Sequence, residues 1–215
     1  MRARTSWTSA PGEPTVTVLL RHGQTPMSVQ KRYAGRSDVP LTDLGVQQAA
    51  AAAKRLASAG LALIVTSPLL RAVRTAEEVA AVTGAQVVKD EGFRETDFGA
   101  WEGLTFAEVQ ERWTDEVRTW LADPAVAPPG GESFTEVSTR VTGALHRALA
   151  GREGQAILIV SHVTPIKTLV AAALLAAPAA LYRMHLDVAA LSEIDWYPDG
   201  PAVLRSFNDT AHLRD

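Results

Sequence analysis

The residues of this sequence that could do chemistry follow short apolar runs, of the kind that form strands buried in a parallel sheet. Arg21 and His22 follow the first run, Arg71 lies shortly after the second, and His162 follows the third. The three runs are Thr15–Leu20, Leu61–Val65 and Ala156–Val160. In open α/β sheets, ligands bind beyond the carboxyl ends of the strands. We therefore expect two imidazoles and two guanidinium groups to converge on one crevice.

This combination of side chains suits a phosphate monoester. Arginine pairs its planar fork of N–H groups with phosphate oxygens and stays charged at any accessible pH. A neutral histidine can attack phosphorus, and the phosphohistidine is labile enough for water to remove the group. Catalysis would rest on positioning and charge neutralisation, with neither a metal nor a cofactor required. Ser67-Pro68 and Thr164-Pro165 are expected to begin helices at the same edge, where they would add free backbone N–H groups.

The leaving alkoxide of such a substrate needs a proton. Glu95 and Glu102 follow the short third strand expected at Gln86–Val88, and either carboxyl group could supply it. A carboxylic acid beside a phosphate dianion has its pKa raised by like charge, which suits this work. Arg32 and Arg36, in the first loop, either contact the non-phosphate part of the substrate or face water.

The elements that must position these residues alternate between strands and helices. Thr42 is a good N-cap for a helix that continues through the alanine run to a C-cap at Gly60, and Ser67 is the N-cap expected for the next helix. Two more helices and a terminal hairpin are expected at about Thr105–Leu121, Phe134–Ala150, Val188–Tyr197 and Ala202–Phe207. The alternation predicts a three-layer α/β/α sandwich with a mostly parallel central sheet and an antiparallel strand or hairpin at one edge.

Composition limits the class of protein. The 215 residues fit one domain, and 47% hydrophobic residues are enough to fill a core. A formal net charge of -3 argues against a protein that coats nucleic acid, and the longest apolar stretch is too short for a membrane span. The chain has no cysteine, so the cytoplasm is the expected location. Residues 1–14 are expected to be a flexible leader or linker before a domain at 15–215.

Five sequence blocks resemble the histidine phosphatase superfamily, also called phosphoglycerate mutase-like. In family order they are LLRHGQT (19–25), TSPLLRAVRTA (66–76), RETDFGAWEG (94–103), PPGGES (128–133) and VSHVTPIK (160–167). The resemblance runs from about Val16 to Phe207. A lone RHG would be weak evidence, whereas five ordered blocks are specific.

The resemblance implies a role for each matched residue. His22 is the nucleophile, Arg21, Arg71 and His162 bind the phosphate, and Glu95 is the preferred proton donor. Further substrate contacts are implied in the loops, at Gln24, Thr25, Ser28, Gly35 and Val163.

The loops depart from the family pattern in three places. Ser28 stands where many members have asparagine, and Ala34 stands where a polar residue is common. Val163-Thr164 replaces the frequent Gly-Gly. The departures weaken the substrate contacts carried over at these positions, and none of them touches the four residues at the strand ends.

The family contains both phosphatases and mutases. Mutases usually carry a longer insertion between the segments that correspond to Glu95 and PPGGES, so the short spacing favours a metal-independent acid phosphatase acting on a small phosphomonoester. A mutase and a non-catalytic phospholigand-binding module are the alternatives. Several blocks are especially similar to α-ribazole phosphatases and to the acid phosphatase domain that actinobacteria fuse behind a ribonuclease H domain. An upstream ribonuclease H domain in the full-length protein is therefore a hypothesis, although this domain is not expected to bind nucleic acid or membrane.

Overall fold

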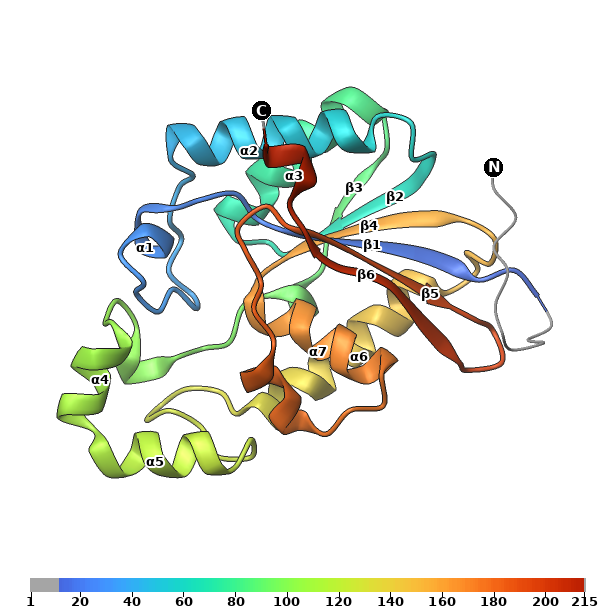
Figure 1. Ribbon diagram of the computed structural model, residues 1–215. Coiled ribbons are helices and arrows are strands. Elements are labelled where there is room, and N and C mark those ends of the chain that lie inside the picture. Colours follow the sequence, from blue (N-terminus) through green and yellow to red (C-terminus); the bar gives the residue numbers. More distant parts are fainter. Residues whose placement is uncertain (1–11, 215) are drawn as a thin grey trace.

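A central six-stranded sheet organises the protein (Figure 1). The computed structural model describes residues 12–214, so most of the expected leader lies outside the described residues. The strands are β1 (Thr15–Arg21), β2 (Leu61–Thr66), β3 (Val87–Lys89), β4 (Ala156–Ser161), β5 (Leu191–Trp196) and β6 (Ala202–Asp209). Their order is β3-β2-β4-β1-β5-β6, and the first four strands of that order are mutually parallel. The hairpin β5–β6 pairs antiparallel to β1 at one edge, which confirms the predicted fold class.

Helices cover both faces of the sheet. The α-helices are α1 (Pro26–Val29), α2 (Asp43–Leu56), α3 (Leu70–Thr83), α4 (Phe106–Arg112), α5 (Thr114–Ala122), α6 (Phe134–Leu149) and α7 (Val163–Ala173). Short 3-10 helices lie at Glu91–Phe93, Gly99–Trp101, Pro178–Arg183 and Ala211–Leu213. Figure 1 shows α2 and α3 on one face and α6 and α7 on the other, with α4 and α5 extending beyond the sheet.

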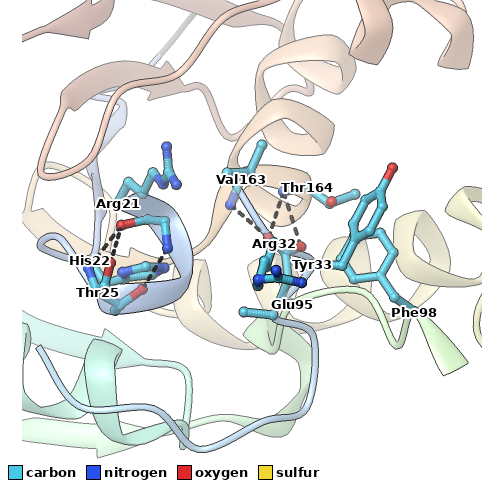
Figure 2. Close-up of a pocket in the computed structure, with 11 residues that line it drawn as sticks. Arg21, His22, Thr25, Arg32, Tyr33, Glu95, Phe98, Val163 and Thr164 are labelled. Carbon is cyan, nitrogen blue, oxygen red and sulfur yellow. Dashed lines mark hydrogen bonds between the residues drawn. The ribbon is translucent and has the colours of Figure 1, made fainter. Parts of the chain in front are cut away.

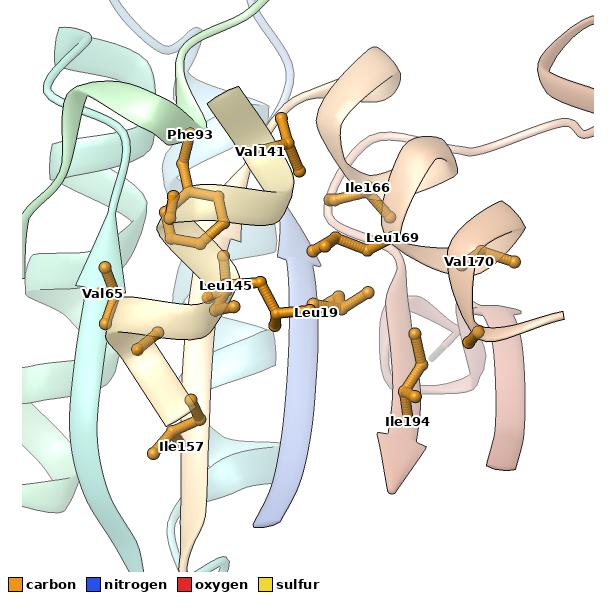
Figure 3. Packing of buried hydrophobic residues seen from close by; sticks show 14 of the residues in the cluster. Leu19, Val65, Phe93, Val141, Leu145, Ile157, Ile166, Leu169, Val170 and Ile194 are labelled. Atoms are coloured by element: carbon orange, nitrogen blue, oxygen red, sulfur yellow. The ribbon is translucent and has the colours of Figure 1, made fainter. Parts of the chain in front are cut away.

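The central strands are uniformly apolar because both of their faces are buried. Leu20 packs with Ile64 and with alanines of α2 and α3, whereas its neighbour Leu19 points to the opposite face. On that opposite face, Leu19 joins Val141 of α6 and Leu169 of α7 (Figure 3). Successive side chains of a strand alternate between faces, so one short run supplies both core layers.

A third cluster, rich in aromatic residues, packs beside the sheet around Trp101 and Trp120, whose rings meet edge to face at 5.4 Å. The single helix expected over Thr105–Leu121 is wrong, because the backbone breaks at Trp113 into α4 and α5. The break lets Val109 of α4 and Trp120 of α5 both be buried in this cluster.

The predicted N-cap of α2 is confirmed and its predicted C-cap is wrong. The Thr42 hydroxyl accepts from the Gly45 amide, but the helix ends at Leu56 with Ala57 as its C-cap. A tight turn, closed by the Ala59 amide on the Leu56 carbonyl, separates the helix from Gly60.

Two glycines allow α2 to touch the loop that carries His22. A Cβ atom on Gly23 would collide with the Gly45 carbonyl, and one on Gly45 would collide with the Gln24 carbonyl and lie 2.9 Å from the Gln24 amide nitrogen. Both obstacles are backbone atoms, so neither can swing away. The close contact holds the first turn of α2 against the segment that follows β1.

Replacing Gly45 with alanine is expected to destabilise the protein by about 1–3 kcal/mol, because the added methyl group must push α2 away from this loop. The matched control is Gly143→Ala in α6, where the nearest atom to an added Cβ is 3.6 Å away. There alanine is expected to stabilise the protein by up to about 1 kcal/mol, through its better helix propensity. Urea unfolding measures both changes, and shifts of the same sign would contradict this account of the contact.

Candidate active site

His22 lies buried at the carboxyl end of β1, with 5% of its surface exposed. Its Nδ1 lies 2.8 Å from the Gly23 carbonyl oxygen, which can only accept a hydrogen. Its Nε2 lies 3.3 Å from Nε of Arg71, which can only donate one. The two contacts define the tautomer: Nδ1 carries the proton, and Nε2 carries the lone pair that a nucleophile needs.

Arg71 is held behind His22 by the first loop. The loop carbonyls of Ala34, Gly35 and Ser37 accept from its terminal nitrogens at 2.7, 3.0 and 2.7 Å, and 1% of the residue is exposed. Thr75, one turn along α3, donates to the Arg71 carbonyl and accepts from the Gly23 amide. Thr75 lies in the TSPLLRAVRTA block, yet only the structure reveals that it joins α3 to the segment that carries His22.

Arg21 and His162 complete the buried group. Nη1 of Arg21 donates to the Leu186 carbonyl at 2.6 Å, and the His162 ring lies 5.1 Å from the His22 ring. Nε of Arg21 and Nδ1 of His162 are buried and find no hydrogen-bond partner among residues 12–214. Buried polar atoms are normally paired, so these two mark places where an anion would find donors.

Ser67 orients His162 and does not cap α3 as predicted. The N-cap of α3 is Leu69, whose amide donates to the Ser67 hydroxyl at 3.3 Å. The hydroxyl in turn lies 2.7 Å from Nε2 of His162. A hydroxyl that accepts from Leu69 can donate to Nε2, which leaves the His162 proton on Nδ1.

The helix amides expected to bind phosphate are bound to carboxylates. The Leu70 amide at the start of α3 donates to Asp38 at 2.6 Å. At the start of α7, the amides of Val163 and Thr164 donate to Glu95 at 3.0 and 3.2 Å. The prediction of free N–H groups is therefore wrong for the Leu70 amide of α3 and for the Val163 and Thr164 amides of α7. The positive end of α7 instead anchors the candidate acid, because a helix N-terminus stabilises a nearby carboxylate.

Arg21, His22 and Glu95 line one cavity of about 200 Å³ (Figure 2). Its lining residues are Arg21, His22, Thr25, Ser28, Arg32, Tyr33, Ala34, Glu95, Phe98, Val163 and Thr164. Figure 2 shows Arg21, His22 and Thr25 on one side, with Glu95, Tyr33 and Phe98 on the other. Arg71 and His162 lie next to His22 but do not belong to the lining.

Other candidates from the sequence lie outside this lining. Gln24 accepts from the Thr42 hydroxyl and donates its amide to Gln48, so it ties the loop to α2. Gly35 leaves room for the loop, since a Cβ there would collide with the carboxylate of Glu102. Glu102 itself accepts from the Arg36 amide and the Ser37 hydroxyl, each at 2.9 Å.

The two arginines left open by the sequence behave differently. Arg32 lines the cavity, and its Nη1 donates to Glu108 at 2.9 Å and to the Gly103 carbonyl at 2.7 Å. Arg36 is more exposed and pairs with Asp97. Tyr33 and Phe98, which also line the cavity, were missed because a lone aromatic residue in a loop has no periodic signal.

Burial controls the charge of the two histidines. It lowers the pKa of His22 well below its usual value, and the cations of Arg71 and Arg21 lower it further. The pKa of His162 is lowered in the same way, first by burial and then by Arg71. Both imidazoles are therefore neutral near pH 7, as the tautomers above require. Burial also lowers the pKa of Arg21, to about 10, which still leaves it a cation.

Across residues 12–214, no three His, Asp or Glu side chains are grouped so that they could hold a metal ion. No helix in that range is long and apolar enough to cross a membrane.

The fold and the site together define a protein of the phosphoryl-transfer class with a histidine at its centre. Residues 17–210 match the model of the histidine phosphatase superfamily, branch 1, and the chain belongs to this family. The resemblance seen in the five sequence blocks is thus confirmed.

Relatives include both activities named in the family. The chain is 50% identical over 208 residues to "Bifunctional protein Rv2228c" of Mycobacterium tuberculosis, and it spans 57% of that relative's length. It is 36% identical to "Probable phosphoglycerate mutase GpmB" of Cronobacter sakazakii, with 91% of this chain and 93% of that protein covered. It is 32% identical to phosphoserine phosphatase 1 of Hydrogenobacter thermophilus, with the same shares covered.

Solved structures share the whole fold. Bacillus stearothermophilus YhfR superposes with a TM-score of 0.86 at 32% identity, over 93% of this chain and all of the other. The mycobacterial glucosyl-3-phosphoglycerate phosphatase Rv2419c, in complex with VO3, gives a TM-score of 0.82 at 32% identity, over 91% of this chain and 100% of the other. An Escherichia coli structure assigned as an α-ribazole-5′-P phosphatase gives 0.83 at 27% identity, over 91% and 97%.

The lowered pKa values of the two histidines predict how stability depends on pH. In the unfolded chain both groups titrate near 6.5, whereas in the folded protein they stay neutral well below that pH. Below 6.5 the unfolded chain therefore binds more protons. The free energy of unfolding should then fall with decreasing pH, by up to about 1.4 kcal/mol per pH unit for each histidine.

Urea unfolding between pH 7 and pH 5 measures this slope, and comparison with variants separates the contribution of the histidines from that of carboxylates, which begin to titrate near pH 5. His162→Gln should make the slope shallower, because one of the two groups is gone. His146→Gln, at an exposed position of α6, is the matched control and should leave the slope unchanged. Equal slopes in all three proteins would contradict the assignment of buried neutral histidines.

Proposed function

We propose that this chain is a phosphomonoesterase that moves the phosphoryl group of a small monoester onto Nε2 of His22 and then onto water. The observation that carries the proposal is the tautomer of His22, whose proton is held by the Gly23 carbonyl while its lone pair lies on Nε2. A catalytically silent pocket for phosphate would need the arginines but no such imidazole. The family supports phosphoryl chemistry in general, and the hydrolytic outcome is the finer step proposed here.

The reaction takes two steps in this proposal. First, Nε2 of His22 forms a bond to phosphorus while the bond to the leaving oxygen breaks, and that oxygen takes the proton of Glu95. Water then forms a bond to phosphorus, the P–N bond breaks with its electron pair returning to Nε2, and Glu95 takes the proton released by water. Arg21, Arg71 and the Nδ1–H of His162 would bind the phosphoryl oxygens throughout.

The same residues account for a metal-independent reaction with an acidic optimum. The buried cations neutralise phosphoryl charge, which is the task a metal ion performs in many other phosphatases. Because burial lowers the pKa of His22, the nucleophile stays neutral at pH values where an ordinary histidine would be protonated. Below pH 6 the imidazole should therefore still be able to attack.

A mutase is the second candidate function. In a mutase, a second hydroxyl of the bound sugar acid would accept the phosphoryl group from His22 in place of water. The relative named for phosphoglycerate mutase favours this alternative, whereas those named for phosphoserine and glucosyl-3-phosphoglycerate phosphatases favour hydrolysis. Isomerisation of phosphoglycerate, measured beside release of inorganic phosphate, separates the two.

An additional domain, the location of the protein and its substrate also stay proposals. The chain spans 57% of the length of the mycobacterial relative named a bifunctional protein, which supports an additional domain in the full-length protein. That this domain is a ribonuclease H, and that the protein works in the cytoplasm on a small phosphomonoester, are expectations from the sequence.

Hydrolysis of p-nitrophenyl phosphate in the presence of EDTA tests the nucleophile. The parent is expected to be active, with its maximum on the acidic side of a scan from pH 4 to pH 9. His22→Ala should lose on the order of a thousandfold or more, because no other group replaces the attacking nitrogen. His146→Ala, on the surface of α6, should match the parent. An His22→Ala protein as active as its control would overturn the mechanism.

The acid is tested by varying the leaving group. Glu95→Gln should lose about a hundredfold in kcat/KM on phenyl phosphate and far less on 2,4-dinitrophenyl phosphate, because kcat/KM reports phosphoryl transfer to His22 and only the poor leaving group needs a proton in that step. Glu102→Gln is the matched comparison: its carboxylate holds the loop around Arg71, so its loss should be similar on both substrates. If the two variants exchanged these patterns, Glu102 would be the proton donor.

A further inference from the structure

Arg140, a side chain outside the cavity, donates hydrogen bonds to the main chain of the segment that carries Glu95. Arg140 of α6 donates from Nη1 to the carbonyls of Gly92 and Arg94, at 2.9 and 2.7 Å. Its Nη2 donates to the carbonyl of Glu95 at 3.0 Å. One guanidinium group thus binds three main-chain carbonyls at the start of the acid-bearing loop, although the nearest of them lies 45 residues away in sequence.

Glu132 of the PPGGES block holds this guanidinium in place. Its two carboxylate oxygens accept from Nε and Nη2 of Arg140 at 2.6 and 2.9 Å, the paired geometry that makes such bonds both strong and directional. Glu132 also binds the far side of the same loop, because its carboxylate accepts from the Asp97 amide and its own amide donates to the Asp97 carbonyl. The pair is largely buried, with 20% of each side chain exposed.

Glu95 is therefore anchored at two separate points. Its carboxylate is bound by the first amides of α7, and its main-chain carbonyl is bound by Arg140 of α6. The first anchor orients the acid, and the second sets where its backbone lies relative to His22. Misplacement of a reacting group by about 1 Å can cost about a hundredfold in rate.

We propose that Arg140, clamped by Glu132, is a positioning residue that holds the carboxyl group of Glu95 where it can protonate the leaving oxygen. This inference rests on the proposed role of Glu95 as the acid. Arg140 touches no reacting atom and does not line the cavity, so it acts only through the loop. It should affect proton donation and leave attack by His22 unchanged.

The same helix supplies a matched control. Arg147, two turns along α6, makes a paired contact with the carboxylate of Asp90 at 3.0 and 2.8 Å. This second pair joins the same two regions of the chain, but Arg147 is 61% exposed and grips a side chain in place of the loop carbonyls. A general loosening of α6 from the loop would follow from either substitution, whereas displacement of Glu95 would follow only from the first.

The experiment compares Arg140→Lys and Arg147→Lys on phenyl phosphate and 2,4-dinitrophenyl phosphate. Lysine keeps the charge and loses the fork, so Arg140→Lys should lose at least about tenfold in kcat/KM on phenyl phosphate and less than about threefold on the dinitrophenyl ester. The comparison uses kcat/KM because it reports phosphoryl transfer to His22, whereas hydrolysis of the phosphohistidine is common to both esters. Arg147→Lys should match the parent on both. Glu132→Gln removes the clamp from the other side and should reproduce the pattern if Arg140→Lys fails to fold.

A double variant isolates the route of the effect. If Arg140 acts through Glu95, Arg140→Lys should change little in the Glu95→Gln background, because the acid it positions is already gone. Equal losses on both esters, or losses that multiply in the double variant, would overturn the inference. A different result would contradict the proposed role of Glu95 as the acid: the Glu95→Gln variant alone would then lose the same activity on both esters.

Discussion

The site depends on burying two arginine cations beside neutral histidines without cancelling the charge of either cation. Burial lowers the pKa of both guanidinium groups, yet Arg71 is bound by three loop carbonyls and Arg21 by one further carbonyl. Carbonyl dipoles replace the lost hydration and leave the positive charge available to an anion. A chain with a net charge of -3 thereby forms a locally cationic pocket. The first loop must pack closely around Arg71 for its carbonyls to reach the guanidinium group. Gly35 and the contact between Gly45 and Gln24 leave the space for this close packing.

Carboxylates around this pocket are bound by the N-termini of helices. The start of α3 binds Asp38, and the start of α7 binds Glu95, so both helix N-termini hold protein anions. Among the described residues that line the cavity, Glu95 is the one acidic residue. Its two anchors, on α6 and α7, allow a carboxylate to sit beside cations that would otherwise draw it into a simple ion pair.

The other side of the cavity is formed mainly by aromatic residues and by loops. Tyr33 and Phe98 pack with their rings tilted and their centroids 4.5 Å apart, and both belong to the aromatic cluster that includes Trp101 and Trp120. Arg32 joins this cluster's loops through Gly103 and Glu108. In the proposed function, the strand ends would bind the phosphoryl group, while loops and short helices would meet the rest of the substrate. Relatives named for different phosphomonoesters are expected to differ most there.

The sequence by itself determined the sheet and the four residues at its strand ends. Strands covered on both faces must be apolar throughout, so β1, β2 and β4 were recognisable, and His22, Arg71 and His162 followed from where those strands end. The tertiary structure alone decided the break at Trp113, the pairing of Ser67 with His162, and the grip of Arg140 on the acid loop. It also decided which anions the helix N-termini bind, because Asp38 and Glu95 approach from 32 and 68 residues away in sequence. Periodic burial leaves a local pattern in a sequence, whereas hydrogen bonds between distant loops depend on backbone paths that no local pattern records.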